Sequence, residues 1–204
     1  MLWLIRHGET PLNVARVLQP ADTPLSGRGA AQAQALAQRL KGAGLAGILT
    51  SDLLRARQTA EAIAAICALP IHESTLLHER NFGDLRGLAY DSLGFDPLTS
   101  DAAPPGGESQ AAFSARTQAA WAEVMARAAA AGGPLAVVTH GLVIREWLWH
   151  GPLTLDAAVA PPERLGNTSV TLASAAPPHR VTTLNCTAHL RGEMSEDAAS
   201  LSGG

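Results

Sequence analysis

Short runs of apolar residues recur along the chain, with room for a helix between most of them. Runs of this length, bounded by polar or turn-forming residues, are typical of buried strands. They are Leu2–Ile5, Ala46–Leu49, a short run that begins at Pro70–Ile71, and Leu135–Thr139. A final pair of strands, Ser169–Ala173 and Arg180–Leu184, is expected on either side of Pro177–Pro178.

The segments between these runs carry apolar residues at helical spacing. The predicted helices span about 27–41, the stretch that reaches Cys67, 108–131 and 142–149. Ser26 is expected to cap the first helix and either Ser51 or Asp52 the second, because short polar side chains can accept the free N–H groups of a first turn. Strands that alternate with helices predict an α/β fold: a three-layer α/β/α arrangement with a mainly parallel sheet.

Residues 80–107 interrupt this alternation with a segment rich in Gly and Pro. Long irregular segments inside a compact domain are more often functional than idle. We therefore expect this segment to form a cap over a binding site. No linker divides the chain, so residues 1–190 are predicted to form a single domain that includes the cap. The small and polar residues 191–204 are predicted to be a disordered tail.

Composition and charge limit the classes of partner that the chain is expected to bind. The net charge of −3 gives no support to nucleic-acid binding, and the two cysteines are too few for a disulfide framework or a cysteine zinc site. No apolar run approaches the ~18 residues that a membrane helix needs, and no basic leader is visible, so a cytoplasmic protein is expected. Trp147 and Trp149 are expected to be buried; the alternative is that they mark the surface of a homodimer.

Residues whose side chains can act in catalysis or bind anions follow the predicted strands. Arg6–His7 ends the first strand, and Arg55 lies in the first turn of the helix after the second. Glu79 opens the irregular segment after the third strand, and His140 ends the long apolar strand. Each alone could be a surface ion-pair partner or a helix cap. Because ligands bind at the carboxyl ends of parallel strands, the set predicts one shared site at that edge of the sheet.

These residues lie in motifs that resemble the histidine phosphatase superfamily, also called phosphoglycerate mutase-like. The matching stretches are Arg6–Thr10 with Asn13, Ser51–Ala56 with Thr59–Ala60, Glu79–Gly83, Pro105–Ser109 and Val138–Gly141. They cover most of the chain, and their common register makes the resemblance specific. It implies a phosphoglycerate mutase-like fold and a phosphoric monoester hydrolase of the histidine acid phosphatase type.

The resemblance also implies a role for each residue. His7 would attack phosphorus and become a phosphohistidine, while Glu79 would act as the general acid and base. Arg6, Arg55 and His140 would bind the phosphoryl oxygens, which suits bidentate guanidinium groups.

Two further residues, Thr10 and Asn13, would line the phosphate pocket. No metal and no cofactor is implied, because the arginines would supply the positive charge.

Some positions depart from the family pattern. Gln19–Asp22 forms a shorter loop with Pro20 in place of a residue that has an N–H, and Arg86 stands where relatives often carry Glu. Between Gly87 and Glu108 the chain has Asp91, Asp96 and Asp101 but no Lys or Arg.

That acidic segment predicts a substrate whose far end is neutral or apolar. Candidate pocket residues for that end are Phe82, Tyr90 and Leu142. The expected function is therefore hydrolysis of a small-metabolite monophosphate through a phosphohistidine, without a metal. The alternatives are an α-ribazole phosphate phosphatase, a cofactor-dependent phosphoglycerate mutase, and a phosphate-binding pseudoenzyme with no catalytic activity.

Overall fold

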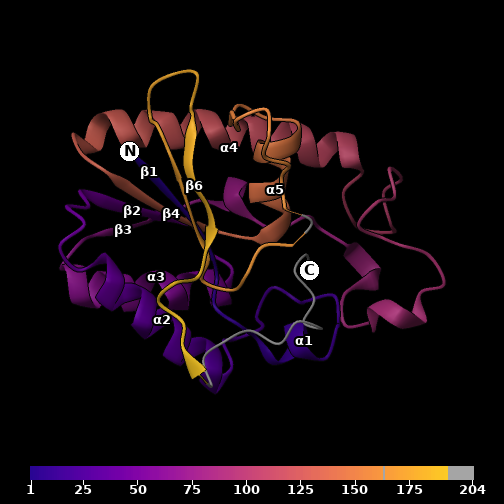
Figure 1. Ribbon diagram of the computed structural model, residues 1–204. Coiled ribbons are helices and arrows are strands. Elements are labelled where there is room, and N and C mark those ends of the chain that lie inside the picture. Colours follow the sequence, from indigo (N-terminus) through magenta and orange to yellow (C-terminus); the bar gives the residue numbers. More distant parts are fainter. Residues whose placement is uncertain (163, 193–204) are drawn as a thin grey trace.

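The computed structural model describes residues 1–162 and 164–192. Within these residues, six strands form one sheet in the order β3-β2-β4-β1-β5-β6 (Figure 1). The strands are β1 (Leu2–Arg6), β2 (Gly47–Thr50), β3 (Ile71–Glu73), β4 (Leu135–Thr139), β5 (Val170–Ala173) and β6 (Val181–Cys186). The first four run parallel, and β5 and β6 are antiparallel at one edge. The predicted mainly parallel α/β sheet is confirmed.

The register of the central strands decides which residues meet at the carboxyl edge. β1 pairs with β4 so that Arg6 lies opposite Thr139. β4 pairs with β2 so that Val138 lies opposite Thr50. The residues that follow these strands (His7, His140 and Ser51) therefore emerge side by side, although the sequence separates them widely.

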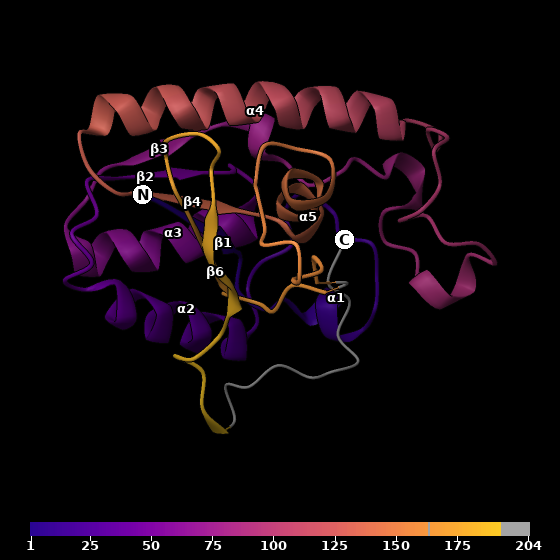
Figure 2. The same cartoon turned by 45° about the horizontal axis from the view of Figure 1, so that its top comes forward.

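Helices cover both faces of the sheet (Figure 2). The elements are α1 (Pro11–Val14), α2 (Gly27–Leu40), α3 (Leu54–Cys67), α4 (Gln110–Ala131) and α5 (Gly141–Trp149). In both views α2 and α3 lie below the sheet, and α4 crosses above it. Each face has its own apolar core: Leu36 and Ile63 pack in one, and Phe113 and Trp147 in the other.

The helix starts follow the sequence with one exception. Ser26 caps α2 by accepting the N–H of Gly29 at 2.9 Å, as predicted. The predicted cap of α3 by Ser51 or Asp52 is wrong, because Leu53 occupies the N-cap position without a side-chain hydrogen bond. Ser51 instead contacts His140, so its hydroxyl serves the candidate site as well as the loop before α3.

The cap segment closes on itself at Gly83. This residue has a φ of +52°, and a Cβ there would lie 2.0 Å from the carbonyl oxygen of Pro105. Only a glycine permits both the positive φ and the close approach, so the two ends of the segment meet. Two short 3-10 turns, Gly83–Leu85 and Tyr90–Ser92, give it local structure.

Of the two tryptophans expected to be buried, only Trp147 is. Trp147 is buried and donates its indole N–H to the carbonyl of Thr117 at 2.9 Å, whereas Trp149 is 49% exposed. Residues 193–204, most of the predicted disordered tail, lie outside the described residues. In the described part of the chain, no helix combines the length and the apolar character needed to cross a membrane.

Candidate active site

His7 is held by contacts to both its backbone and its ring. Its N–H donates to the carbonyl of Thr139 at 3.0 Å, and its carbonyl accepts from Asn167 Nδ2 at 3.1 Å and from the N–H of Thr168 at 3.2 Å. Nδ1 lies 2.7 Å from the carbonyl oxygen of Gly8. A carbonyl can only accept, so Nδ1 carries the proton, and Nε2 keeps the lone pair needed for nucleophilic attack.

The second imidazole, His140, lies against the first. The ring centroids of His7 and His140 are 5.1 Å apart with an interplanar angle of 57°. Nε2 of His140 is 2.9 Å from Ser51 Oγ, while Nδ1 is buried and has no hydrogen-bond partner among the described residues. If the hydroxyl donates to Nε2, Nδ1 carries a proton that it can offer to a ligand.

Two buried guanidinium groups surround this pair. Arg6 and Arg55 are each 1% exposed. Arg6 donates to the carbonyl of Leu165 at 2.5 Å, and Arg55 donates to that of Pro20 at 3.2 Å, with Nε of Arg55 buried and unbonded within the described residues. Burial of a guanidinium is costly without a negative partner, so the arrangement is suited to an anion.

The same two charges act on the imidazoles. Burial, followed by the charges of Arg55 and Arg6, holds the pKa of His7 well below its usual range. Burial and the Arg55 charge do the same to the pKa of His140. Burial lowers the pKa of Arg55 to about 10, so it remains a cation at neutral pH. The site therefore combines neutral imidazoles with charged guanidinium groups.

Glu79 is the buried carboxyl beside these cations. Its two oxygens accept the backbone N–H groups of Arg80 at 3.0 Å and of Leu142 at 3.1 Å. Burial raises the pKa of Glu79, although these two N–H groups and the charges of Arg55 and Arg6 act against the rise. A carboxyl with a raised pKa holds a proton at higher pH than an ordinary glutamate, which is what a general acid needs.

The comparisons with known proteins agree with this arrangement. The profile of the histidine phosphatase superfamily (branch 1) matches residues 2–186. The chain belongs to the histidine phosphatase superfamily. A "Probable phosphoglycerate mutase GpmB" of Salmonella paratyphi B is 35% identical over 153 residues, which cover 70% of each chain.

Solved structures of this superfamily have the same fold. A mycobacterial glucosyl-3-phosphoglycerate phosphatase in complex with inorganic phosphate superposes with a TM-score of 0.74 at 30% identity, covering 93% of this chain and 99% of that one. The α-ribazole phosphatase of Shigella flexneri gives a TM-score of 0.73 at 26% identity, covering 91% and 96%. The expected fold is thereby confirmed. Because the superfamily members and structural neighbours are phosphatases or mutases, this histidine phosphatase is a phosphoryl-transfer enzyme.

Thr10 and Asn13, the weaker candidates for phosphate binding, form the cap of α1 in this histidine phosphatase. The Thr10 N–H donates to Asn13 Oδ1 at 3.1 Å, and the Asn13 N–H donates to Thr10 Oγ1 at 3.0 Å. Thr10 Oγ1 also donates to Gln19 Oε1 at 2.8 Å. These contacts fix the loop after His7, and a direct contact with phosphate remains a prediction.

Sequence reasoning gave no role to two supporting residues, Thr59 and Asn167. Thr59 accepts the N–H of Gly8 at 3.0 Å and donates to the carbonyl of Arg55 at 2.8 Å, which joins α3 to the loop after β1. Asn167 supports the carbonyl of His7 from the residues just before β5. The sequence signal that could have found Asn167 is the run of polar residues, Asn167–Ser169, directly before an apolar strand.

The three predicted substrate-pocket residues belong to one apolar cluster: Phe82 and Leu142 lie in it, and Tyr90 packs against it. Phe82 is 2% exposed, packs in the core and has the Arg80 guanidinium over its ring. The Tyr90 ring lies under Arg16. Leu142 contributes its backbone N–H to Glu79 rather than to an open phosphate pocket. A substrate pocket formed by these three residues remains a prediction.

Asp91, the first of the three aspartates between Gly87 and Glu108, is paired with a cation. Asp91 forms an ion pair with Arg16 at 3.0 Å, and Asp96 accepts the hydroxyl of Tyr90 at 2.5 Å. The Tyr90 hydroxyl is neutral and leaves the charge of Asp96 in place. A substrate with a neutral or apolar far end therefore remains a prediction.

Arg80, next to Glu79, ties the cap to the site. Its guanidinium donates to the carbonyls of Ser100 at 2.7 Å, Glu108 at 3.3 Å and Pro97 at 3.4 Å. Its own N–H binds Glu79. Residues 97–108 are thereby held to the residue that follows the carboxyl. Within the described residues, no group of three or more His, Cys, Asp or Glu side chains is placed to hold a metal ion.

Proposed function

We propose that this histidine phosphatase hydrolyses a small phosphomonoester through a phosphohistidine on His7, without a metal ion. The observation that carries the proposal is the contact between His7 and His140 beside two buried guanidinium groups. Nε of Arg55 and Nδ1 of His140 are buried donors without partners in the described residues. A phosphoryl group would supply acceptor oxygens for both, and so relieve the cost of burying them.

In the first step, Nε2 of His7 would attack phosphorus in line with the ester oxygen. The N–P bond forms while the P–O bond to the alcohol breaks. Arg6, Arg55 and His140 would bind the equatorial oxygens, where charge is spread in the transition state. Glu79, whose pKa is raised by burial, would give its proton to the leaving alcohol oxygen.

In the second step, water would attack the phosphohistidine. The now ionised Glu79 would take one proton from this water as its oxygen bonds to phosphorus. The N–P bond breaks, and Nε2 of His7 regains its lone pair, since Nδ1 keeps its proton on the carbonyl of Gly8. Inorganic phosphate leaves, and Glu79 is again protonated for the next cycle.

The test is turnover of p-nitrophenyl phosphate by the wild type and by His7→Ala. The wild type should release phosphate, and the variant should lose at least three orders of magnitude in kcat, because it lacks the nucleophile. His72→Ala is the matched control, since His72 is exposed on β3. Mass spectrometry after a quench that avoids acid should find phosphate on His7. Unchanged turnover by His7→Ala would refute the proposal, and absence of turnover in the wild type would favour a pseudoenzyme.

Two other candidates follow from the comparisons. The relative named as a probable phosphoglycerate mutase favours transfer of the phosphate back to an acid, and the similarity to an α-ribazole phosphatase favours a nucleoside monophosphate-like ester. Product analysis separates them. Isomerised phosphoglycerate would indicate a mutase, and free phosphate with preference for α-ribazole phosphate would indicate the second.

A further inference from the structure

The chain around Glu79 lacks regular secondary structure. After a 3-10 turn at Thr75–Leu77, residues 78–82 belong to neither a helix nor a strand. The backbone carbonyls of such a segment need partners outside a helix or a sheet ladder, because buried carbonyls are seldom left without a hydrogen bond. The position of the Glu79 carboxyl therefore depends on the groups that hold these carbonyls.

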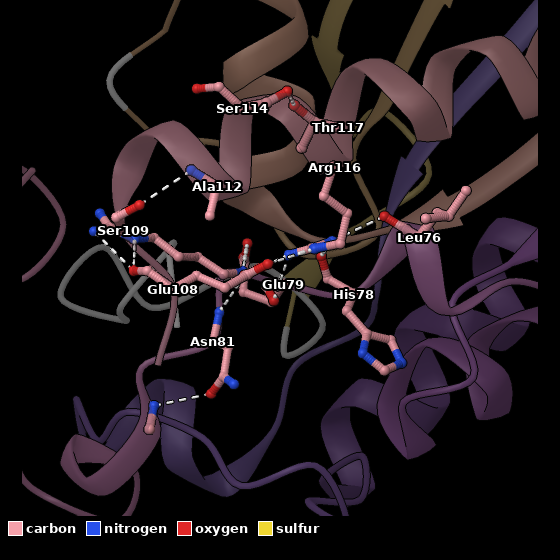
Figure 3. A network of polar contacts seen from close by, with 12 residues as sticks. Leu76, His78, Glu79, Asn81, Glu108, Ser109, Ala112, Ser114, Arg116 and Thr117 are labelled. Carbon is pink, nitrogen blue, oxygen red and sulfur yellow. Dashed lines mark hydrogen bonds and ion pairs between the residues drawn. The ribbon is translucent and has the colours of Figure 1, made fainter. Parts of the chain in front are cut away.

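Arg116 on α4 supplies three of these partners (Figure 3). Its guanidinium donates to the carbonyl of Leu76 at 2.8 Å, to that of His78 at 2.7 Å and to that of Glu79 itself at 3.2 Å. One side chain from a long helix thereby holds the backbone that leads into the proposed general acid.

Glu108 completes the contacts of this guanidinium. Its carboxylate accepts from Arg116 at 2.7 and 2.8 Å, so that all five N–H donors of the guanidinium are used. Oε2 of Glu108 also accepts the N–H of Asn81 at 2.9 Å. The pair thus holds the chain on both sides of the Glu79 side chain, through carbonyls up to residue 79 and through the N–H of residue 81.

The two partners form an ionised pair with little exposure to water. The side chains of Arg116 and Glu108 are 16% and 19% exposed. Burial acts to raise the pKa of Glu108, but the Arg116 guanidinium and the Asn81 N–H outweigh it and keep that pKa below its usual range. The guanidinium also lies 5.3 Å from the centroid of the Phe113 ring, which packs in the core. A planar fork that is paired at two points and packed on a ring has a well-defined position.

We propose that Arg116, supported by Glu108, is a positioning residue for the general acid: it fixes the backbone of Glu79 so that the carboxyl can protonate the leaving oxygen. It acts through Glu79. A displacement of about 1 Å in a reacting group can lower a rate by about 100-fold, so the position of this backbone controls much of the effect of the acid. The inference rests on the proposed function, since it presumes that Glu79 is the acid.

The test compares phenyl phosphate with p-nitrophenyl phosphate. The two esters differ in one nitro group, but phenolate is the more basic leaving group and gains more from a proton donor. Arg116→Gln should lower kcat for phenyl phosphate roughly 10- to 100-fold, with a smaller loss for p-nitrophenyl phosphate and little change in either KM. In the Glu79→Gln background the same substitution should cause less than about a twofold further loss, because no acid remains to be positioned.

Two further variants complete the test. Glu108→Gln keeps the size of the side chain and an acceptor for the Asn81 N–H, but removes the charge that holds Arg116. It should show a smaller loss that is again greater for phenyl phosphate, and it decides the question if Arg116→Gln does not fold. Arg127→Gln, near the other end of α4, is the matched control and should equal the wild type with both esters.

Equal losses with the two esters, or the full further loss in the Glu79→Gln background, would overturn the inference and give Arg116 a role in stability alone. In that case, p-nitrophenyl phosphate turnover and phosphate on His7 in the wild type would show that the proposed function still stands. Absence of both signals in the wild type would overturn the two proposals together.

Discussion

The hydroxyl oxygen of Ser51 lies 2.9 Å from Nε2 of His140, and the strand register explains why. Ser51 leaves β2 and His140 leaves β4, two neighbouring parallel strands. The hydroxyl fixes the ring, so that the opposite nitrogen, Nδ1, is the one left for a ligand. Ser51 is therefore a positioning residue in the proposed mechanism.

Ser51→Ala should lower kcat about fivefold with little change in KM, because the loss of one hydrogen bond corresponds to about 1 kcal/mol and the imidazole is expected to act mainly in the transition state. Steady-state kinetics with p-nitrophenyl phosphate measure both constants. Ser92→Ala, at an exposed serine of the cap, should match the wild type. An unchanged kcat in Ser51→Ala would show that His140 needs no such support.

Glu79→Gln tests the proton transfer. Glutamine keeps the size and an acceptor oxygen but cannot protonate a leaving group. With an alkyl phosphate, kcat/KM should fall by about 10²–10⁴, the usual contribution of general acid catalysis. With p-nitrophenyl phosphate the loss should be smaller, because its leaving group is stable as an anion. Equal losses with both esters would contradict the assignment of Glu79 as the acid.

Gly29 allows α2 to approach the loop after His7. A Cβ at Gly29 would lie 2.0 Å from the carbonyl oxygen of Glu9, whereas a Cβ at Gly27, in the same helix, would meet nothing within 4 Å. Gly29→Ala should therefore destabilise the protein by about 1–3 kcal/mol or more. Gly27→Ala should be neutral or stabilising by up to about 1 kcal/mol. Urea unfolding measures both, and equal effects would contradict the close approach.

The lowered pKa values of the two buried imidazoles predict a loss of stability in acid. Below an ordinary histidine pKa of about 6.5, the unfolded chain takes up protons that the folded protein refuses. The contribution of the two neutral imidazoles to the free energy of unfolding is therefore complete above about pH 6.5 and decreases as the pH falls toward their folded-state pKa values.

The matching measurement is the free energy of unfolding of the wild type and of His7→Gln between about pH 7.5 and 5, a range that spans the ordinary histidine pKa. Below about pH 6.5 the wild type should lose up to about 1.4 kcal/mol per pH unit more than the variant, the slope for one proton. Parallel curves would mean that His7 has an ordinary pKa in the folded protein.

The sheet and the central site residues could be predicted because strand ends and motifs coincide. Arg6, His7 and His140 leave adjacent strands, so parallel pairing alone brings them together. Tertiary contacts overrode the local signals elsewhere. Ser51 has the chemistry of a helix cap, but the neighbouring strand offers its hydroxyl an imidazole.

The contacts that the predicted pocket residues and the cap aspartates make could not be read from the sequence. Aromatic and acidic residues in the cap indicate a binding surface only when no other partner occupies them. Tyr90 and Asp96 contact each other, and Arg16 neutralises Asp91 from a segment far away in the sequence. Such pairings depend on how the cap folds back, and the apolar pattern does not encode that path.

The hydrogen bonds of Arg80 connect Glu79, the proposed general acid, directly to the cap. The guanidinium of Arg80, the residue that follows Glu79, donates to the carbonyls of Pro97, Ser100 and Ala102 in the cap and of Glu108 just after it. The N–H of Arg80 donates to the Glu79 carboxyl. A ligand that displaces residues 97–108 must therefore also disturb the proton donor. Insertions or deletions in that loop would change catalytic rate as well as substrate choice, so specificity and turnover cannot evolve independently here.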